Sequence, residues 1–209
     1  MKIRVLAERD LDVFRNWSDE VDLSYIVQPF VLEDCLTIDN NLIINNANLI
    51  KMPENLEVFG SLILMGNSLL SELSSKITIH GNLNIADSCI KKIDKNVAIT
   101  GSIYAKNSLL KSLPDNFSIN DWLYISNCKD FVFPKNLSVA GIVADGVDIK
   151  ELPTDFRTIS LRGSGIADEV INDWIARNKE LGVEISIREN DSFVSYVQIE
   201  QNNTRKCKK

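Results

Sequence analysis

Histidine is almost absent from this 209-residue chain, which contains a single one, His80. Most familiar catalytic schemes need a titratable pair or a nucleophile beside a base, and one imidazole leaves few of them open. The four cysteines are Cys35, Cys89, Cys128 and Cys207. They show no C-x-x-C spacing, which speaks against a zinc site or a redox pair and favours free thiols. We therefore expect no metal, no cofactor and no enzymatic activity.

Long apolar runs are also missing. The longest, YIVQPFVL at 25–32, is far too short to cross a bilayer, and charges interrupt the N-terminal segment where an export signal needs an apolar core. The formal net charge of −6 argues against binding to a phosphate backbone. We expect a cytoplasmic protein without membrane or direct nucleic-acid contacts. The basic end TRKCKK is expected to be a frayed, solubilising tail.

The chain has instead a repeat of about 20 residues. Alternating apolar segments begin at residues 36, 56, 77, 97, 117, 137 and 156, so the period stays between 19 and 21. Alternation predicts a strand with one buried face, and a fixed period predicts that each unit forms one turn of a solenoid. The residues expected to face inward are Leu36/Ile38/Asn40/Leu42/Ile44, Leu56/Val58/Gly60/Leu62/Leu64, Ile77/Ile79/Gly81/Leu83/Ile85, Val97/Ile99/Gly101/Ile103/Ala105, Phe117/Ile119/Asp121/Leu123/Ile125, Leu137/Val139/Gly141/Val143 and Phe156/Ile159/Leu161.

Three further columns recur with the same period. Glycine in the middle of the alternating stretch predicts a kink in a long strand, and Asp121 in this column is expected to turn toward backbone N–H groups or water. Proline at the end of four units predicts an extended or irregular back side rather than sheet. The polar corners are Asn46, Asn67, Asp87, Asn107, Asn127 and Gly146, and the prolines are Pro53, Pro114, Pro134 and Pro153.

The two ends depart from the repeat and are expected to cap it, because a solenoid exposes an apolar cross-section. Leu11, Phe14 and Trp17 predict a helix over 8–20, and apolar residues over 166–182 predict a second one. Two alternating segments, VEISI and FVSYVQI, then predict a hairpin. The expected organisation is an N-terminal cap over 1–35, a repeat solenoid over 36–165, and a C-terminal cap with a basic tail over 166–209.

The columns of Leu123, Ile125, Phe133, Pro134 and Leu137 resemble the 20-residue bacterial leucine-rich repeat L-x-L-x-x-N-x-L-x-x-L-P-x-x-L. This short form occurs in type III secreted effectors of enteric pathogens and in many bacterial and phage proteins. The resemblance covers about residues 36–165 and implies a β-rich, leucine-rich-repeat-like solenoid that serves as a protein-binding scaffold.

The repeat differs from that family in two ways. Its asparagine, as in Asn107 and Asn127, comes one residue earlier than the family's corner asparagine, and an extra alternating pair precedes the expected strand. A β-helix-like coil with a bent, two-part sheet is therefore an architectural alternative. Some of those effectors also carry a ubiquitin-ligase domain with a Cys-x-Asp nucleophile, and this chain contains Cys128-Lys129-Asp130. Cys128 lies in a repeat corner without a basic or dipolar setting, so we predict that it is not catalytic.

We expect the chain to be a non-enzymatic solenoid that binds a protein in the cytoplasm, by covering a functional face of the target or by bridging subunits. By analogy with the resembling repeats, it would be an effector or phage inhibitor of a host or defence protein, acting in the host cytoplasm if delivered there. One alternative is an acidic nucleic-acid mimic. A second, less favoured, is a β-helix-type enzyme acting on polysaccharide, which needs several carboxylates on one stretch of sheet.

The expected binding site lies on the outward face of the coils, where stacking brings equivalent positions together about 4.8 Å apart. Three large aromatic side chains converge there, and exposed aromatics grouped in this way are typical of interaction anchors. A cap, a loop or a second copy of the chain, forming a homodimer, are alternative covers for this face. The expected site comprises the ladder Ile63, Asn84, Tyr104 and Tyr124, with Trp122 on the same face and Phe59 and His80 in the adjoining ladder.

Overall fold

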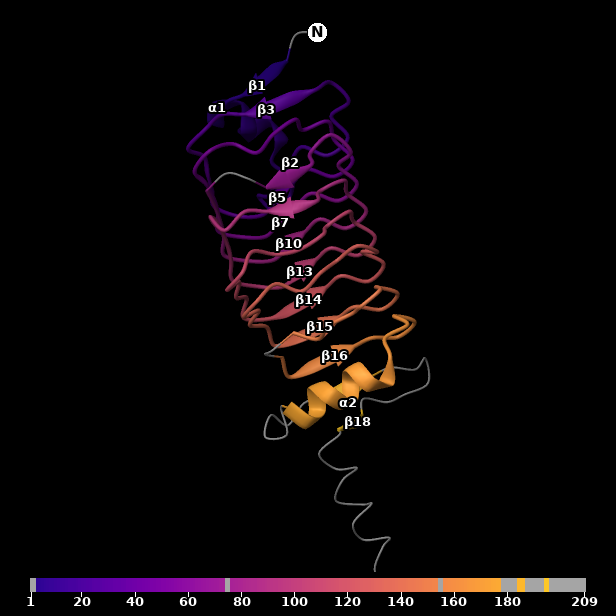
Figure 1. Cartoon of the computed structure of the whole chain (residues 1–209). Helices are drawn as coiled ribbons and strands as arrows, with labels where there is room; N and C mark the ends of the chain where they lie inside the picture. Colours follow the sequence, from indigo (N-terminus) through magenta and orange to yellow (C-terminus); the bar gives the residue numbers. More distant parts are fainter. Residues whose placement is uncertain (1–2, 74–75, 154–155, 178–183, 187–193, 196–209) are drawn as a thin grey trace, which may run out of the picture.

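The computed structural model describes residues 3–73, 76–153, 156–177, 184–186 and 194–195. In these residues the chain winds into a parallel β-solenoid of about seven turns, whose strands lie one below another along the molecule (Figure 1). The solenoid predicted from the 20-residue period is confirmed. Each turn has three sides, and side chains from all three meet in one continuous apolar core.

One side of the solenoid is a long sheet that runs its whole length (Figure 1). All its neighbouring strands pair in parallel except the last two, β17 and β18, which are antiparallel. The strands, in their order in the sheet, are β2 (Val21–Asp22), β5 (Leu42–Ile43), β7 (Leu62–Ile63), β10 (Leu83–Asn84), β13 (Ile103–Tyr104), β14 (Trp122–Tyr124), β15 (Gly141–Val143), β16 (Thr158–Ser160), β17 (Glu184–Ser186) and β18 (Val194–Ser195).

Four turns contribute a strand to a second sheet, and in each of these turns that strand comes directly before the strand of the long sheet. A short bend joins the two, and Gly60, Gly81 and Gly101 lie in it, which confirms the predicted kink. A Cβ at Gly81 would lie 2.7 Å from the carbonyl oxygen of Gly60, so only glycine allows the coils to approach this closely. The solenoid thus has the bent, two-part sheet of the β-helix-like alternative. The strands are β4 (Thr37–Ile38), β6 (Leu56–Val58), β9 (Ile77–Ile79) and β12 (Val97–Ile99).

The third side was expected to be irregular, and this is wrong for two turns. Strands β8 (Glu72–Leu73) and β11 (Lys92–Ile93) pair in parallel there. The amide of Asp94 donates to the carbonyl oxygen of Leu73 at 2.8 Å. Proline replaces this donor in the following turn, at Pro114, and among the described residues no named strand continues the pair. Beyond this pair, pairing on this side is reduced to an isolated parallel bridge between Lys92 and Ser112.

Through the fifth turn the predicted alternation matches the buried residues on both sides of the bend, whereas its middle position is half-buried or, at Asp121, exposed. In the sixth turn it is wrong by one residue: Gly141 pairs with Trp122 and Val143 with Tyr124, so Ile142 and Ala144 fill the core. The bend of this turn is one residue shorter than in the earlier turns. Gly141 therefore does not lie in the bend, as Gly60 does, but is the first residue of strand β15. Asp121, in the column of the bend, is exposed to water as expected.

The polar corners of the turns have positive φ, which asparagine and glycine tolerate. Asn46, Asp87, Asn107 and Asn127 lie there at φ of 49–62°. The prediction is wrong for Asn67, because Gly66 takes the corner conformation with φ of 67°. Asn67 is buried, and its side-chain amide donates to the carbonyl oxygen of Ile44.

The N-terminal end does not contain the helix expected over 8–20. A short helix α1 (Glu8–Leu11) continues as one 3₁₀ turn, Asp12–Phe14, and Trp17 lies beyond it, fully exposed. Strands β1 (Arg4–Leu6) and β3 (Phe30–Leu32) pair in parallel beside this helix. The long sheet begins at β2, within the segment 1–35 that was expected to be a cap.

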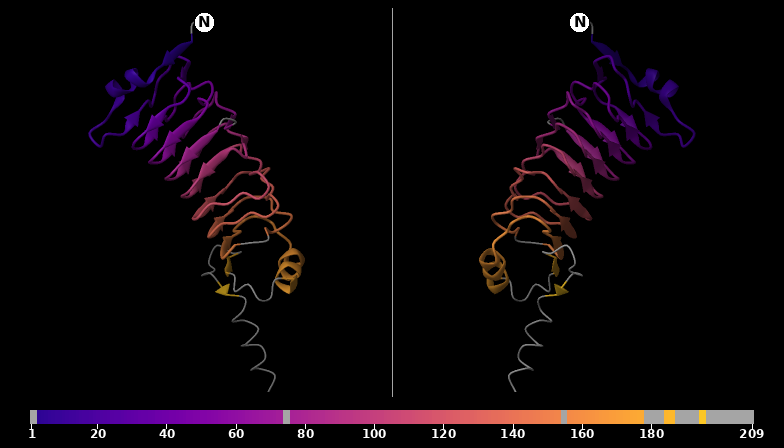
Figure 2. Two further views of the ribbon diagram at one scale, coloured as in Figure 1. Left: turned by 90° about the vertical axis from the view of Figure 1, so that its left-hand side faces the viewer. Right: turned by 90° about the vertical axis from the view of Figure 1, so that its right-hand side faces the viewer.

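At the other end, helix α2 (Asp168–Arg177) lies across the last turn (Figure 2). Its Trp174 is buried, stacks on Phe156 with ring centroids 4.8 Å apart, and donates to the carbonyl oxygen of Pro153 at 2.7 Å. The parts of the predicted C-terminal cap over 178–183, 187–193 and 196–209, including the basic tail, lie outside the described residues. Neither described helix is long and apolar enough to cross a membrane.

Candidate functional site

The outward face of the long sheet brings the predicted ladder together. Strand pairing aligns Ile63 with Asn84, Asn84 with Tyr104, and Tyr104 with Tyr124 on four consecutive strands. The same column continues to Ile43 on one side and to Val143 on the other. Val143 was expected in the core and was therefore not part of the predicted ladder.

Three aromatic rings form a contiguous cluster on this face. The rings of Tyr104 and Tyr124 are stacked with centroids 4.7 Å apart and an angle of 5° between their planes. Trp122, two residues before Tyr124 on β14, lies 6.0 Å from it at 24°. Tyr104 is 36% exposed, while Trp122 and Tyr124 are half-buried. Because the two tyrosine rings cover each other's faces, their free edges and hydroxyl groups are what a ligand would meet.

Gly141, on the next strand, lies directly against the Trp122 ring. A Cβ at residue 141 would lie 2.6 Å from two carbons of the indole. The absence of a side chain at Gly141 thus leaves room for the indole to lie over the backbone of the next strand. Gly141 was expected in the glycine column of the bend, although the adjacent alternation of Ile142 and Ala144 pointed to the shifted register.

The long-sheet face carries little charge. Between β5 and β14 its central column is aliphatic, amide or aromatic, and the neighbouring column on the bend side is equally neutral, although 25% of the chain's residues are charged. Depletion of charge with enrichment of tyrosine and tryptophan is the composition of a protein interface core. The neutral side chains of the two columns are Ile43, Ile63, Asn84, Tyr104 and Tyr124, and Asn41, Ser61, Asn82, Ser102 and Trp122.

The bend-side column is held by hydrogen bonds that run from turn to turn. Asn41 Oδ1 accepts the amide of Ser61 at 2.6 Å, and Ser61 Oγ accepts that of Asn82 at 2.9 Å. Asn82 Oδ1 then accepts the amide of Ser102 at 2.8 Å, and Ser102 Oγ accepts that of Trp122 at 3.3 Å. These bonds satisfy amides at the bend, where strand pairing is interrupted. The aromatic cluster therefore begins on a fixed backbone.

The hydroxyl of Tyr124 remains a neutral donor at physiological pH. Burial raises the pKa of Tyr124, and the neighbouring Tyr104 and Asp121 raise it further. A phenol donates one hydrogen bond and accepts others, so the cluster combines apolar contact area with directed polar groups.

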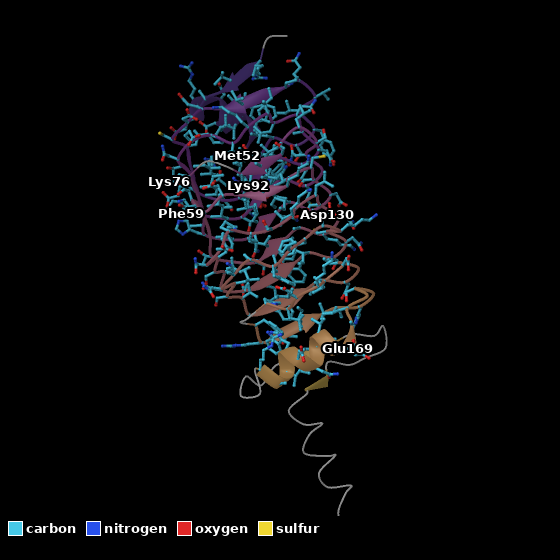
Figure 3. All side chains as sticks on the ribbon, viewed as in Figure 1. Met52, Phe59, Lys76, Lys92, Asp130 and Glu169 are labelled. Carbon is cyan, nitrogen blue, oxygen red and sulfur yellow. The ribbon has the colours of Figure 1, made fainter. Side chains whose placement is uncertain are left out.

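Phe59 and His80 lie on the other side of the bend, directly after β6 and β9. Their rings stack with centroids 4.8 Å apart at 6°, and His80 Nε2 lies 3.0 Å from Glu57 Oε1. Figure 3 shows Phe59 at one edge of the solenoid and Asp130 at the other. These two rings form a pair of their own, in earlier turns and across the bend from the column of Tyr104 and Tyr124.

Cys128 lies inside a corner and is not exposed. Its Sγ donates to the carbonyl oxygen of Ala105 at 3.0 Å, and burial raises the pKa of the thiol despite hydrogen bonds from Ser108. A buried, protonated thiol is a poor nucleophile. Among the described residues, no three His, Cys, Asp or Glu side chains are grouped so that they hold a metal ion.

A shallow groove of about 600 Å³ lies on the third side, between the fifth and sixth turns. Its apolar floor comes from Phe131, Phe133 and Leu152, and lysine and acidic side chains of both signs surround it. Val132 at its rim is 67% exposed. Nothing in its mixed charge indicates one class of ligand, so the aromatic face of the long sheet is the better candidate.

Comparison with known proteins gives no relative on which to rest an assignment: no family model matches the chain, and no curated protein or solved structure matches it significantly.

Proposed function

We propose that this protein is a non-enzymatic binding solenoid whose long-sheet face docks on a partner protein. The observation that supports this most is the stacked cluster of Trp122, Tyr124 and Tyr104 on a rigid, uncharged sheet face. Binding through this face would cover a functional surface of the partner or hold two of its subunits together.

The chemistry of the face favours a protein ligand. Tyrosine and tryptophan surrounded by serine, asparagine and glycine form the surfaces with which antibodies bind proteins, because the rings give large contact areas at low entropic cost and the small polar groups adapt their hydrogen bonds. Tyr104 and Tyr124 already hold each other in place, so binding would immobilise little that is free.

The alternatives from the sequence fit this face less well. A nucleic-acid mimic would need acidic side chains on its binding surface, and the two columns of the face have none between β5 and β14. A β-helix-type enzyme acting on polysaccharide would need several carboxylates on one stretch of sheet, and the two columns have none between β5 and β14. The resemblance to repeats of bacterial effector and phage proteins supports the narrower proposal that the partner is a host or defence protein, met in the cytoplasm and inhibited by occlusion.

The test is an affinity capture from the native host with the parent and with the Trp122→Ala/Tyr124→Ala variant, followed by binding measurements on the purified partner. Each single substitution should weaken binding by at least about 1 kcal/mol, roughly fivefold, with little loss of fold stability. Affinity should change little between low and moderate salt, because the face is uncharged.

Leu109→Ala/Val132→Ala is the matched control, since it removes two exposed apolar side chains from other parts of the surface. This control should retain the partner. The proposal fails if the aromatic double variant binds as well as the parent. Sedimentation analysis of the parent separates a second outcome, because self-association that depends on the same two residues would make the partner another copy of this chain.

A further inference from the structure

A second surface lies at the N-terminal end of the solenoid, away from the aromatic cluster on β13 and β14. Trp17 projects from the turn between the 3₁₀ segment and β2, and its side chain is fully exposed. An isolated leucine on a surface needs no explanation, but a whole indole in water is costly, and tryptophan is the residue most enriched at the centres of interfaces.

The turn that carries Trp17 is rigid. Asn16 Oδ1 accepts the amides of Ser18 at 2.9 Å and Glu20 at 3.1 Å, and the guanidinium of Arg15 donates to the carbonyl oxygen of Asp19 at 2.9 Å. The amide of Asn16 also donates to the carbonyl oxygen of Glu20 at 3.0 Å. These bonds close the turn on both sides of the indole.

The first full turn of the solenoid holds this turn in place. Asn40 Nδ2 donates to the carbonyl oxygen of Ser18 at 3.0 Å, and Asn41 Nδ2 donates to Glu20 Oε1 at 2.6 Å. Hydrogen bonds from the side chains of Asn16 and Asn41 hold the pKa of Glu20 below its usual range. The backbone that carries the indole is thus held in place next to an ionised carboxylate, and this pre-organisation favours a binding anchor.

The N-terminal segment around Trp17 is strongly acidic. Residues 3–34 contain three arginines and eight acidic residues, a formal charge of −5 out of −6 for the whole chain. Arg15 is paired with Asp12 at 3.4 Å and with Asp19 at 3.2 Å, so Asp12, Arg15, Asp19 and Glu20 together carry a formal charge of −2. The end of the solenoid that carries the indole is therefore acidic, whereas the long-sheet face is neutral.

We infer that this turn is a second docking site, which binds a basic protein surface through Trp17 as the apolar anchor and through the carboxylates of Asp12, Asp19 and Glu20. Charge complementarity selects this occupant, because a second copy of the same acidic end, a nucleic acid or an anionic membrane would be repelled. The protein thus has two sites of different chemistry, one neutral along its side and one acidic at its end.

The probe for the test is a phage-displayed library of random 12-residue peptides, selected on the full chain and sequenced after parallel selection on Trp17→Ala. We expect a class of peptides that requires Trp17 and carries net positive charge with apolar residues. Synthetic peptides of this class should lose at least tenfold in affinity to Trp17→Ala, and severalfold to Asp19→Asn. Asparagine tolerates the positive φ of residue 19, 59°, so Asp19→Asn removes the charge without opening the turn. Raising salt from about 50 to 300 mM should weaken this binding severalfold.

Two matched controls separate this site from the face proposed above. Glu169→Gln removes one negative charge on α2 at the opposite end of the molecule (Figure 3), and Trp122→Ala removes an indole from the long sheet; both should bind the Trp17-dependent peptides normally. The inference is overturned if no Trp17-dependent class appears, if that class is neutral or acidic, or if Trp17→Ala abolishes self-association of the chain. Peptides that depend on Trp122 report on the long-sheet face alone.

Discussion

The indole of Trp122 rests on the backbone of Gly141 in the next turn, so closely that a Cβ at Gly141 would lie 2.6 Å from its ring carbons. Gly81 in the bend is equally crowded, but there the nearest atoms include the carbonyl oxygen of Gly60 at 2.7 Å. The two glycines thus serve different purposes. One makes room for a side chain of the candidate site, and the other makes room for the backbone of the neighbouring turn.

Replacing each glycine by alanine should separate these roles. Gly81→Ala forces two backbones apart and should lower the free energy of unfolding by about 1–3 kcal/mol, as overpacking does. Gly141→Ala only has to displace a ring that rotates toward solvent, and the lower entropy of the unfolded chain offsets about 0.4–1 kcal/mol of that cost. Chemical denaturation measures both.

For the aromatic cluster, the order of the two variants should be reversed: Gly141→Ala should have the larger effect. Gly141→Ala should change the near-ultraviolet circular dichroism of the folded protein and weaken partner binding, because Trp122 loses its orientation against Tyr124. Gly81→Ala should leave both unchanged while the protein is folded. Equal loss of stability in the two variants would show that Trp122 is not seated on Gly141.

Most of the fold follows from the spacing of apolar residues. Leu83, Ile103 and Leu123 recur at 20-residue steps, and such a period fixes which strands become neighbours before any contact is known. The register of Tyr104 beside Tyr124 follows from the same rule. Gly141 was misplaced because a one-residue deletion in the bend put it where the glycine column was expected, and pattern alone does not locate such a deletion.

The aromatic cluster itself was only half predictable. Trp122 and Tyr124 are two residues apart on one strand, so the sequence places them on the same face. The angle between their rings depends on the space above Gly141, which the repeat period does not reveal. Trp17 was assigned to a helix because its spacing from Leu11 and Phe14 is helical. In the structure the side chain of Asn16 captures the amides of Ser18 and Glu20, and this local bonding competes successfully with the helix.

Tyr124 should ionise at higher pH than an ordinary tyrosine, since burial and the neighbouring Tyr104 and Asp121 raise its pKa above 10.0. The difference in ultraviolet absorbance between the parent and Tyr124→Phe follows this one group. Asp121→Asn removes the smallest of the three causes and should lower the Tyr124 pKa slightly.

The sign of the linked stability follows from the same shift. Between the unfolded and folded pKa values of Tyr124 the native state binds more protons, so the free energy of unfolding should fall as pH rises through this range. The Tyr124→Phe variant should show a smaller decline above pH 10. If the free energy of unfolding of Tyr124→Phe declined as steeply as that of the parent, the raised pKa of Tyr124 would be contradicted.

Cys128 should resist alkylation in the native protein. Its thiol is buried and its pKa is raised by burial, so little thiolate forms at neutral pH, whereas Cys35 is exposed. Peptide mapping after iodoacetamide treatment should show Cys35 modified at least about tenfold faster than Cys128, and the two rates should converge on unfolding. Comparable native rates would reopen the case for a reactive Cys128.

The hydrogen-bonded column along the bend yields the last prediction. Asn82 Oδ1 accepts the amide of Ser102 at 2.8 Å, two residues before Tyr104. Asn82→Ala leaves this amide without its acceptor and should lower the free energy of unfolding by about 1 kcal/mol. Hydrogen exchange at Ser102 should become faster while exchange at core amides follows the global change.

Asn82→Ser should restore most of the loss, because Ser61 and Ser102 perform the same function in the turns on either side, where their Oγ atoms accept amides at 2.9 and 3.3 Å. Asn120→Ala, at an exposed position of the bend in a later turn, is the control for the removal of an asparagine side chain. If Asn82→Ser and Asn82→Ala destabilise the protein equally, the column contributes packing rather than hydrogen bonds, and the backbone under the aromatic cluster is held by the glycine contacts alone.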